Sequence, residues 1–416
     1  MVISRLKTNS FLKSVLLLAG GSAIAQLITV GVTPILTRLF TPEDFGMLAV
    51  FVSALSILLV MGSLRFEFAL PQIQSRRTAQ ALVYLCLLLV LLAGGLVFCF
   101  LLLAPLPWEK GEVSKEIMWL LPLGLIFAGA FQVANYWAIR EKDFRTLAKA
   151  NINRSFFQAA LQVGLGFSGL GALALAIGYV VGQAIGASKL LLKALPVSKR
   201  FSIWRNRIIA YSYKRFPIFS VPAGLLNVSA IHVMPFLLLY TYGAATAGFF
   251  SLAQRAMGAP MAFLGMAIAN VFLSELPRIK ENEPKRLMRF YLTACRNLSL
   301  VGLPIVAGAT LILWYGVEFI FGKEWSEAAL FALCLAPLFL GQFIVVPLSQ
   351  TLTVLGRQDV QLLWDFLRLV LPNSIFFVSY WMGFGVKAAV SFYGLAMAFI
   401  YIVNILLTVV CIKKWQ

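Results

Sequence analysis

The chain is poor in the residues on which metal sites and most catalytic sites depend. Its 416 residues include one histidine, His232, and the five cysteines are scattered through apolar segments without a C-x-x-C pair. A zinc site needs several His, Cys or carboxylate ligands together, and bound ATP needs a G-x-x-x-x-G-K-S/T loop, which the sequence lacks. The sequence therefore predicts no metal, no cofactor and no ATP-driven step on this polypeptide. The cysteines are expected to be small core residues.

Charged residues are also scarce, and acidic ones are the scarcer kind. Only 12% of residues are charged, with 16 Asp and Glu against 35 Lys and Arg, whereas 61% are hydrophobic and mean hydropathy is +0.88. This composition is typical of integral membrane proteins. The basic residues form neither a tail nor a recognition motif, so we expect anionic lipid headgroups, and not nucleic acid, as their partner.

Long apolar segments indicate an all-α integral membrane fold. A bilayer core of about 30 Å requires about 20 mostly apolar residues in a helix. About twelve segments meet this need, although the fifth is short and ends in a glycine-rich turn. Their approximate limits are 11–39, 45–64, 79–103, 117–139, 156–169, 172–192, 216–240, 247–273, 291–314, 328–355, 362–381 and 390–412.

The positions of Lys and Arg indicate the orientation of these spans. Twenty-nine of the 35 lie on one side of the predicted membrane, at the chain ends, in every second gap between spans or within the adjoining ends of the spans, and five lie on the other side. By the positive-inside rule both termini are expected in the cytoplasm. The remaining basic residue, Arg255, falls inside the eighth span.

The spans divide into two groups of six around a basic segment. Residues 195–215 are hydrophilic, and their apolar residues are spaced as in an amphipathic helix on the inner headgroups. Pro-Ile-Leu at 34–36 and Pro-Phe-Leu at 235–237 end the first span of each group. The sequence predicts an N-terminal six-helix bundle (1–194), a connector (195–215) and a C-terminal six-helix bundle (216–416), related as parallel repeats.

Arg255 is the strongest candidate for a binding residue. It lies about nine residues, roughly 13 Å, into its span, where an Arg costs about 2.5–3.5 kcal/mol unless it faces a cavity or a partner. No Asp or Glu occupies a comparable depth in any predicted span. A guanidinium there suits a phosphate group. Alternatively, Arg255 snorkels or holds two helices in register.

Other polar residues in the spans are weaker candidates. Arg38 and Arg65 lie at opposite ends of the first two spans and would contact an anion on its way through, or anchor the helices at the interface. Gln26, Asn227 and Gln254 would hydrogen-bond sugars, or hold helices together. His232 would couple proton movement to transport, or be a neutral core histidine.

Several motifs resemble one transporter family. They are LTRLFTPEDFG at 36–46, the linker 65–77, NYWAIR at 135–140 with Phe144 and the following 145–157, and GFFSLAQR at 248–255. These are similar to the polysaccharide-transporter, or O-antigen flippase, family of the multidrug/oligosaccharidyl-lipid/polysaccharide superfamily, and the likeness extends over the whole chain in length and span count. The resemblance implies a two-lobed, MATE-like fold of the bacterial cytoplasmic (inner) membrane. It also implies movement of an undecaprenyl-pyrophosphate-linked oligosaccharide to the periplasmic leaflet, alongside polysaccharide polymerase machinery.

Two other functions remain open at this point. A multidrug cation antiporter of the same superfamily would share the fold, but it is expected to carry acidic residues in its cavity. A membrane-bound polymerase or ligase would need acid-base groups on sizeable outer loops. The outer segments here, about 104–116 and 315–327, are short and contain no histidine. The sequence therefore favours a flippase that is not an enzyme.

Overall fold

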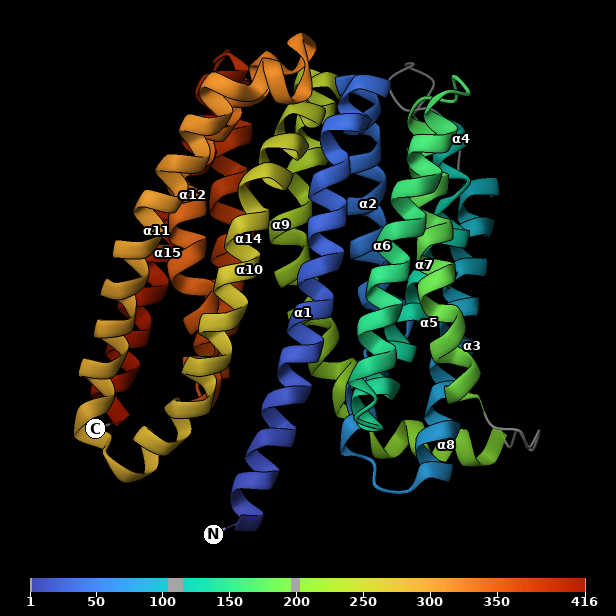
Figure 1. Ribbon diagram of the computed structural model, residues 1–416, viewed down its shortest axis with the longest axis vertical. Helices are drawn as coiled ribbons and strands as arrows, with labels where there is room; N and C mark the ends of the chain where they lie inside the picture. The colour runs from blue at the N-terminus through green and yellow to red at the C-terminus, as the bar shows by residue number, and fades with distance from the viewer. Residues whose placement is uncertain (1, 104–114, 196–202, 416) are drawn as a thin grey trace. The chain divides into compact units, whose positions relative to one another are not determined.

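The computed structural model describes residues 2–103, 115–195 and 203–415. Contacts divide the chain into two compact units, Met1–Val228 and Ser229–Gln416, each built of long helices (Figure 1). The boundary between the units falls inside one helix, α9. The predicted limits at 194 and 215 stay a prediction.

The first unit contains six long helices. Helix α6 packs against both α1 and α7. Helix α5 contacts α2, α3 and α7. The elements are α1 (Val2–Leu39), α2 (Pro42–Gly62), η1 (Phe66–Gln72), α3 (Arg76–Leu103), α4 (Lys115–Met118), α5 (Leu121–Arg140), α6 (Phe144–Gly166), α7 (Ala172–Ala194), α8 (Ile203–Ser212), η3 (Phe216–Ser220) and the start of α9 (Val221–Tyr242).

The second unit contains six more long helices, with α12 packed against α10, α11 and α15. Gly394 of α15 allows this packing, because a Cβ there would lie 2.3 Å from the Cys334 carbonyl oxygen of α12. The elements are the rest of α9, α10 (Ala244–Asn282), α11 (Pro284–Phe321), η4 (Lys323–Trp325), α12 (Ser326–Val345), η5 (Val346–Leu348), α13 (Gln350–Val354), α14 (Gln358–Trp381) and α15 (Val386–Trp415).

Ten helices within the described residues are long and apolar enough to cross a bilayer. The fifth and eighth predicted spans correspond to the two other long helices, α6 and α10. The predicted all-helical membrane fold with two six-helix bundles is therefore confirmed. The fifth span is corrected, because its helix begins at Phe144 and not at Phe156.

Local caps explain where two of these helices begin. At the start of α2, the Thr41 hydroxyl accepts a hydrogen bond from the Asp44 backbone N–H, and the Asp44 carboxylate accepts one from the Thr41 N–H at 3.0 Å. This reciprocal capping box, followed by Pro42, ends α1 and starts α2 within a very short turn.

Asp143 caps α6 and explains its early start. Its carboxylate accepts hydrogen bonds from the Thr146 N–H at 3.1 Å and from Lys193 Nζ at 2.6 Å. Partial burial raises the pKa of Asp143, but the hydrogen bonds from Lys193 and Thr146 outweigh it and hold the pKa below its ordinary value. The cap thus ties the start of α6 to the end of α7.

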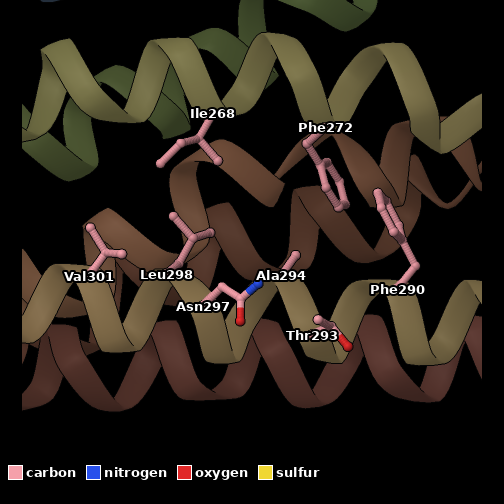
Figure 2. Close-up of a pocket in the computed structure, with 8 residues that line it drawn as sticks. All are labelled: Ile268, Phe272, Phe290, Thr293, Ala294, Asn297, Leu298 and Val301. Atoms are coloured by element: carbon pink, nitrogen blue, oxygen red, sulfur yellow. The ribbon is translucent and has the colours of Figure 1, made fainter.

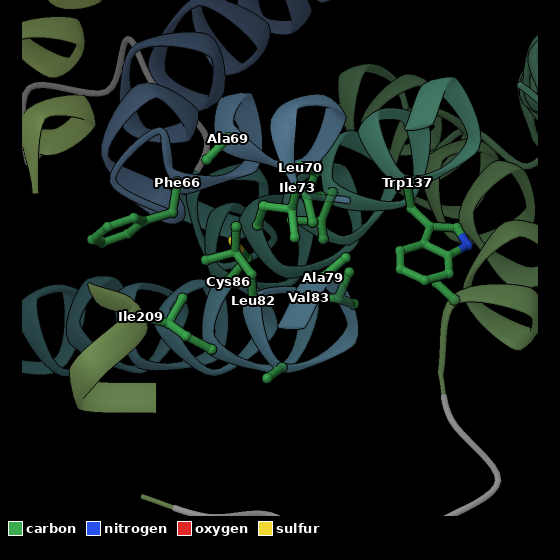
Figure 3. Packing of buried hydrophobic residues seen from close by; sticks show 13 residues of the cluster. Phe66, Ala69, Leu70, Ile73, Ala79, Leu82, Val83, Cys86, Trp137 and Ile209 are labelled. Atoms are coloured by element: carbon green, nitrogen blue, oxygen red, sulfur yellow. The ribbon is translucent and has the colours of Figure 1, made fainter. Parts of the chain in front are cut away.

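The segment between α2 and α3 is folded into the core of the first unit (Figure 3). In η1, Phe66 and Leu70 are buried in a cluster with Leu82 and Cys86 of α3. Ile209 of α8 joins this cluster, whereas Ile208 is 49% exposed. The helix predicted in the connector is thus present as α8, and among its described side chains Ile209 is buried in the first unit. Phe201, also assigned to that helix, lies outside the described residues.

Candidate functional site

Arg255 lies in the middle of a bilayer-length stretch of α10. It is eleven residues beyond Ala244, about 16 Å along the helix axis, and its side chain is partly buried. Gln254, beside it, is also partly buried. Both residues therefore lie well inside a long helix, and their depth in the bilayer stays a prediction.

A cavity of about 380 Å³ begins one turn further along α10. One face of α10 lines it, through Gly258, Met261, Gly265 and Ala269, and α12 and η5 line it through Gln342, Phe343, Val346 and Pro347. Gln254 and Arg255 precede Gly258 by four and three residues, so they continue the stripe of α10 that faces this cavity. Gln342 is the one polar side chain among the lining residues whose side chains are described.

An apolar groove of about 470 Å³ lies further along α10, against α11 (Figure 2). Phe272 of α10 stacks on Phe290 of α11 with ring centroids 5.2 Å apart, and Ile268 and Leu298 extend the apolar surface. Arg286 lies one helical turn before Phe290 on the same face of α11. The groove therefore has mostly apolar walls, and a basic residue lies one helical turn before it on α11.

The remaining predicted residues are dispersed. Arg38 and Gln26 are exposed on α1, and Asn227 and His232 are partly buried on α9. Their contact with a substrate and the coupling role of His232 stay predictions.

Arg65 is held in an unusual backbone conformation. Leu64 and Arg65 both have positive φ, 52° and 61°, which is costly for non-glycine residues. The guanidinium lies 4.8 Å from the Phe68 ring centroid, and a Cβ on Gly224 would lie 2.8 Å from its Nη2. Its Nε is buried and has no hydrogen-bond partner among the described residues. Arg65 thus remains able to donate a hydrogen bond.

The acidic residue nearest to Arg65, Glu67, is fully buried. It accepts hydrogen bonds from Ser63 Oγ and, at 2.6 Å, from Gln132 Nε2 of α5. Within the described part of the chain Glu67 forms no salt bridge with Arg65. Gln132 is thus a hydrogen-bond donor to a buried carboxylate.

A second buried acid lies in α14 of the other unit. Asp365 and Arg368 are 5% and 4% exposed and form a salt bridge of 3.5 Å. The guanidinium of Arg368 also lies 4.7 Å from the Trp364 ring centroid. The pairing expected from their i, i+3 spacing is thus observed, and it neutralises the carboxylate.

Arg154 is a candidate that the sequence prediction missed. We counted it among the cytoplasmic basic residues, but it lies in the middle of α6, where its Cβ approaches Gly186 of α7. Cβ atoms built on Gly178, Gly182 and Gly186 would lie 2.5 Å from Gln162, 2.8 Å from Gln158 and 3.0 Å from Arg154. Glycine every fourth residue is the signal that would have revealed this pairing.

The family model for polysaccharide biosynthesis proteins matches residues 35–330, which is most of the chain. The chain belongs to this polysaccharide biosynthesis family. The match begins one residue before the LTRLFTPEDFG motif and includes the GFFSLAQR motif with Arg255. Family membership therefore confirms the resemblance that these motifs carry. No curated protein matches the chain.

Solved structures of one superfamily share the fold of this polysaccharide biosynthesis family member. The lipid II flippase MurJ in an inward closed conformation has a TM-score of 0.70 at 13% identity, over 94% of this chain and 87% of that one. An inward-facing MATE multidrug transporter of the MOP superfamily has 0.61 at 15%, over 96% and 94%. A MOP transporter from Pyrococcus furiosus described as having a binding pocket of reversed polarity has 0.58 at 15%, over 97% and 96%.

Proposed function

We propose that the protein is a flippase for undecaprenyl-pyrophosphate-linked oligosaccharides of the O-antigen or capsule type. The observation that carries the proposal is Arg255, a cation about 16 Å along a bilayer-length helix and one turn from a cavity of about 380 Å³. A guanidinium at that depth suits the pyrophosphate of such a lipid. The protein would work by alternating access, with Gln254, Asn227 and Gln26 as hydrogen-bond partners for the sugars.

The groove between α10 and α11 supports a lipid-linked substrate. Its volume of about 470 Å³ is within the range of ligand pockets, and its walls are apolar. Phe290 and Leu298 would contact the prenyl tail, with Arg286 near the headgroup. Arg286 pairs with Glu283 at 3.0 Å, but both side chains are more than half exposed, so this salt bridge contributes little and is easily replaced by a phosphate contact.

The charge distribution supports an orientation in the bacterial cytoplasmic (inner) membrane. The gaps between spans that contain most of the Lys and Arg would lie in the cytoplasm, together with both termini. On that side Arg65 would meet the incoming pyrophosphate, and Arg38 would meet it on the opposite side. Anionic lipids would neutralise the other exposed basic residues, and polysaccharide polymerase machinery would use the product.

A multidrug cation antiporter is the second candidate, because MATE transporters share the fold. That function would need an acidic group available to a cationic drug. Of the buried acids, Asp365 is paired with Arg368, and Glu67 accepts hydrogen bonds from Ser63 and Gln132. The mid-helix charges at Arg255 and Arg154 favour an anionic substrate instead.

The test is a gene deletion complemented with wild type, Arg255→Ala or Arg278→Ala, at equal expression. Surface polysaccharide and the leaflet that holds the lipid-linked repeat unit are measured together. We expect the deletion to trap the repeat unit in the cytoplasmic leaflet. Wild type and the control Arg278→Ala, an exposed arginine of the same helix, should restore polymer, and Arg255→Ala should not. Repeat units that reach the periplasmic leaflet unpolymerised would indicate a polymerase or ligase, and unchanged polymer would favour a drug exporter.

A further inference from the structure

Arg154 lies at hydrocarbon depth inside the first unit. Its Cβ faces Gly186, the fifteenth of the 23 residues of α7, a helix apolar and long enough to span the bilayer. Gly186 is three residues from the middle of α7, which is about 4.5 Å along its axis. An arginine at that depth costs about 2.5–3.5 kcal/mol, so it needs a specific reason to be there.

The surroundings of Arg154 fix its stem but leave its hydrogen-bonding groups available. The guanidinium lies 5.0 Å from the Phe131 ring centroid of α5. It makes no hydrogen bond and no salt bridge with any residue in the described ranges, and its Nε is buried. Packing on Phe131 and Gly186 therefore positions five N–H donors without satisfying them.

Two side chains of α7 add complementary groups. Tyr179 interacts electrostatically with Arg154 and lies beside Gln183. Gln183 is 4% exposed, and its Oε1 is buried without a partner among the described residues. The cluster thus offers guanidinium donors and one buried acceptor.

We propose that Arg154, Tyr179 and Gln183 form a binding site in the first unit for a glycosyl phosphate group, an inference that rests on the proposed flippase function. Phosphate oxygens accept hydrogen bonds from the planar Arg154 fork, and a neighbouring sugar hydroxyl donates to Gln183 Oε1. The ligand satisfies groups that the protein leaves unpaired at a depth where water is scarce.

The side chain of Arg154 is only partly buried, which allows a ligand to reach it. A purely structural arginine at this depth would be expected to bond helix carbonyls or a carboxylate, as Arg140 bonds the Ile73 and Gln74 carbonyl oxygens at 2.9 and 2.7 Å. Arg154 makes no such bond in the described part of the chain. Arg140 is therefore an anchoring arginine, whereas the guanidinium of Arg154 has hydrogen-bond donors available for a ligand.

The test measures binding to the full-length protein in nanodiscs by native mass spectrometry. The probes are undecaprenyl pyrophosphate, undecaprenol, which lacks the phosphates, and phosphatidylglycerol, which carries a phosphate on another lipid. The variants are Arg154→Lys, which keeps the charge but loses the fork, and Gln183→Glu, which places a carboxylate beside the guanidinium. Arg145→Lys, exposed in the first turn of α6, is the matched control.

We expect undecaprenyl pyrophosphate to bind wild type and Arg145→Lys equally, and both site variants roughly 10- to 100-fold more weakly. Gln183→Glu should also raise thermal stability, because the new carboxylate pairs with Arg154; its loss of binding is therefore not a loss of folding. Unchanged binding in both site variants would overturn the proposed binding site but would leave the proposed flippase function standing. Equal affinity for all three probes would identify a general lipid contact, and no binding by wild type would overturn the flippase function as well.

Discussion

The glycines of α7 that pack on α6 lead to a prediction about stability. Glycine-to-alanine substitutions should change the stability of the protein in opposite directions at Gly182 of α7 and at Gly164 of α6. A Cβ added at Gly182 would lie 2.8 Å from Gln158 Cβ and 3.0 Å from the Arg154 carbonyl oxygen. The second contact is with the backbone of α6, so a rotamer change cannot relieve it. Gly164 of α6 is the matched control, because a Cβ there would have no atom within 4 Å.

The expected magnitudes follow from two terms. Alanine stabilises a helix by about 0.8–1.0 kcal/mol relative to glycine, and overpacking a close contact costs about 1–3 kcal/mol. Gly164→Ala should therefore stabilise the protein by about 1 kcal/mol, and Gly182→Ala should destabilise it by about 1 kcal/mol. Adding Gly178→Ala to Gly182→Ala should cost less than the sum of the two, because one displacement of α6 relieves both contacts.

The assay is the unfolding midpoint in detergent micelles, followed by tryptophan fluorescence at matched protein concentration. Equal stabilisation by Gly182→Ala and Gly164→Ala would refute the close packing of α6 on α7. It would also remove the basis for placing Arg154 at hydrocarbon depth, since that depth is taken from Gly186.

Three further outcomes follow from the first unit. Thr41→Ala should lower stability by about 1 kcal/mol through loss of the α2 cap, measured by the same unfolding assay and contradicted by an unchanged midpoint. Gln132→Leu should cost about 1.5–3 kcal/mol, because buried Glu67 loses a charge-assisted hydrogen bond; a stability equal to wild type would show that Glu67 is protonated or rebonded. The lowered pKa of Asp143 means that its contact with Lys193 stabilises the protein above the ordinary aspartate pKa and is lost as pH falls below it. The midpoints of wild type and Asp143→Asn should therefore differ near neutrality and converge in acid, and a constant difference would contradict the assignment.

Most of the fold could be predicted because a helix that crosses a bilayer needs a long, mostly apolar segment, which is visible in the sequence. Apolar length located most spans, and the Thr41 to Asp44 signature located the start of α2. The fifth span was started too late because Arg145, Lys149 and Arg154 were assigned to a loop. In the structure Arg154, Gln158 and Gln162 pack on glycines of α7, which allows a polar stripe to continue into the membrane.

The site was harder to predict, because whether a residue binds a substrate depends on the direction in which its side chain points as well as on its depth in the membrane. Arg255 and Gln254 could be selected from depth alone, and their position one turn from a cavity became visible only with α12 and η5 in place. Arg65 and Glu67 are only two residues apart, but Glu67 accepts its hydrogen bonds from Ser63 at the end of α2 and from Gln132 of α5. Sequence spacing alone could not show these partners.

The most direct test of the flippase function uses purified protein in proteoliposomes that contain the lipid-linked oligosaccharide in both leaflets. A periplasmic-type glycosidase or a sugar-binding protein added outside reports how much substrate becomes accessible with time. We predict that wild type moves the inner pool to the outer leaflet, that Arg255→Ala moves far less, and that Arg278→Ala matches wild type. An inner pool that stays protected with wild-type protein present, under conditions in which the protein is folded and binds the lipid, would contradict the account.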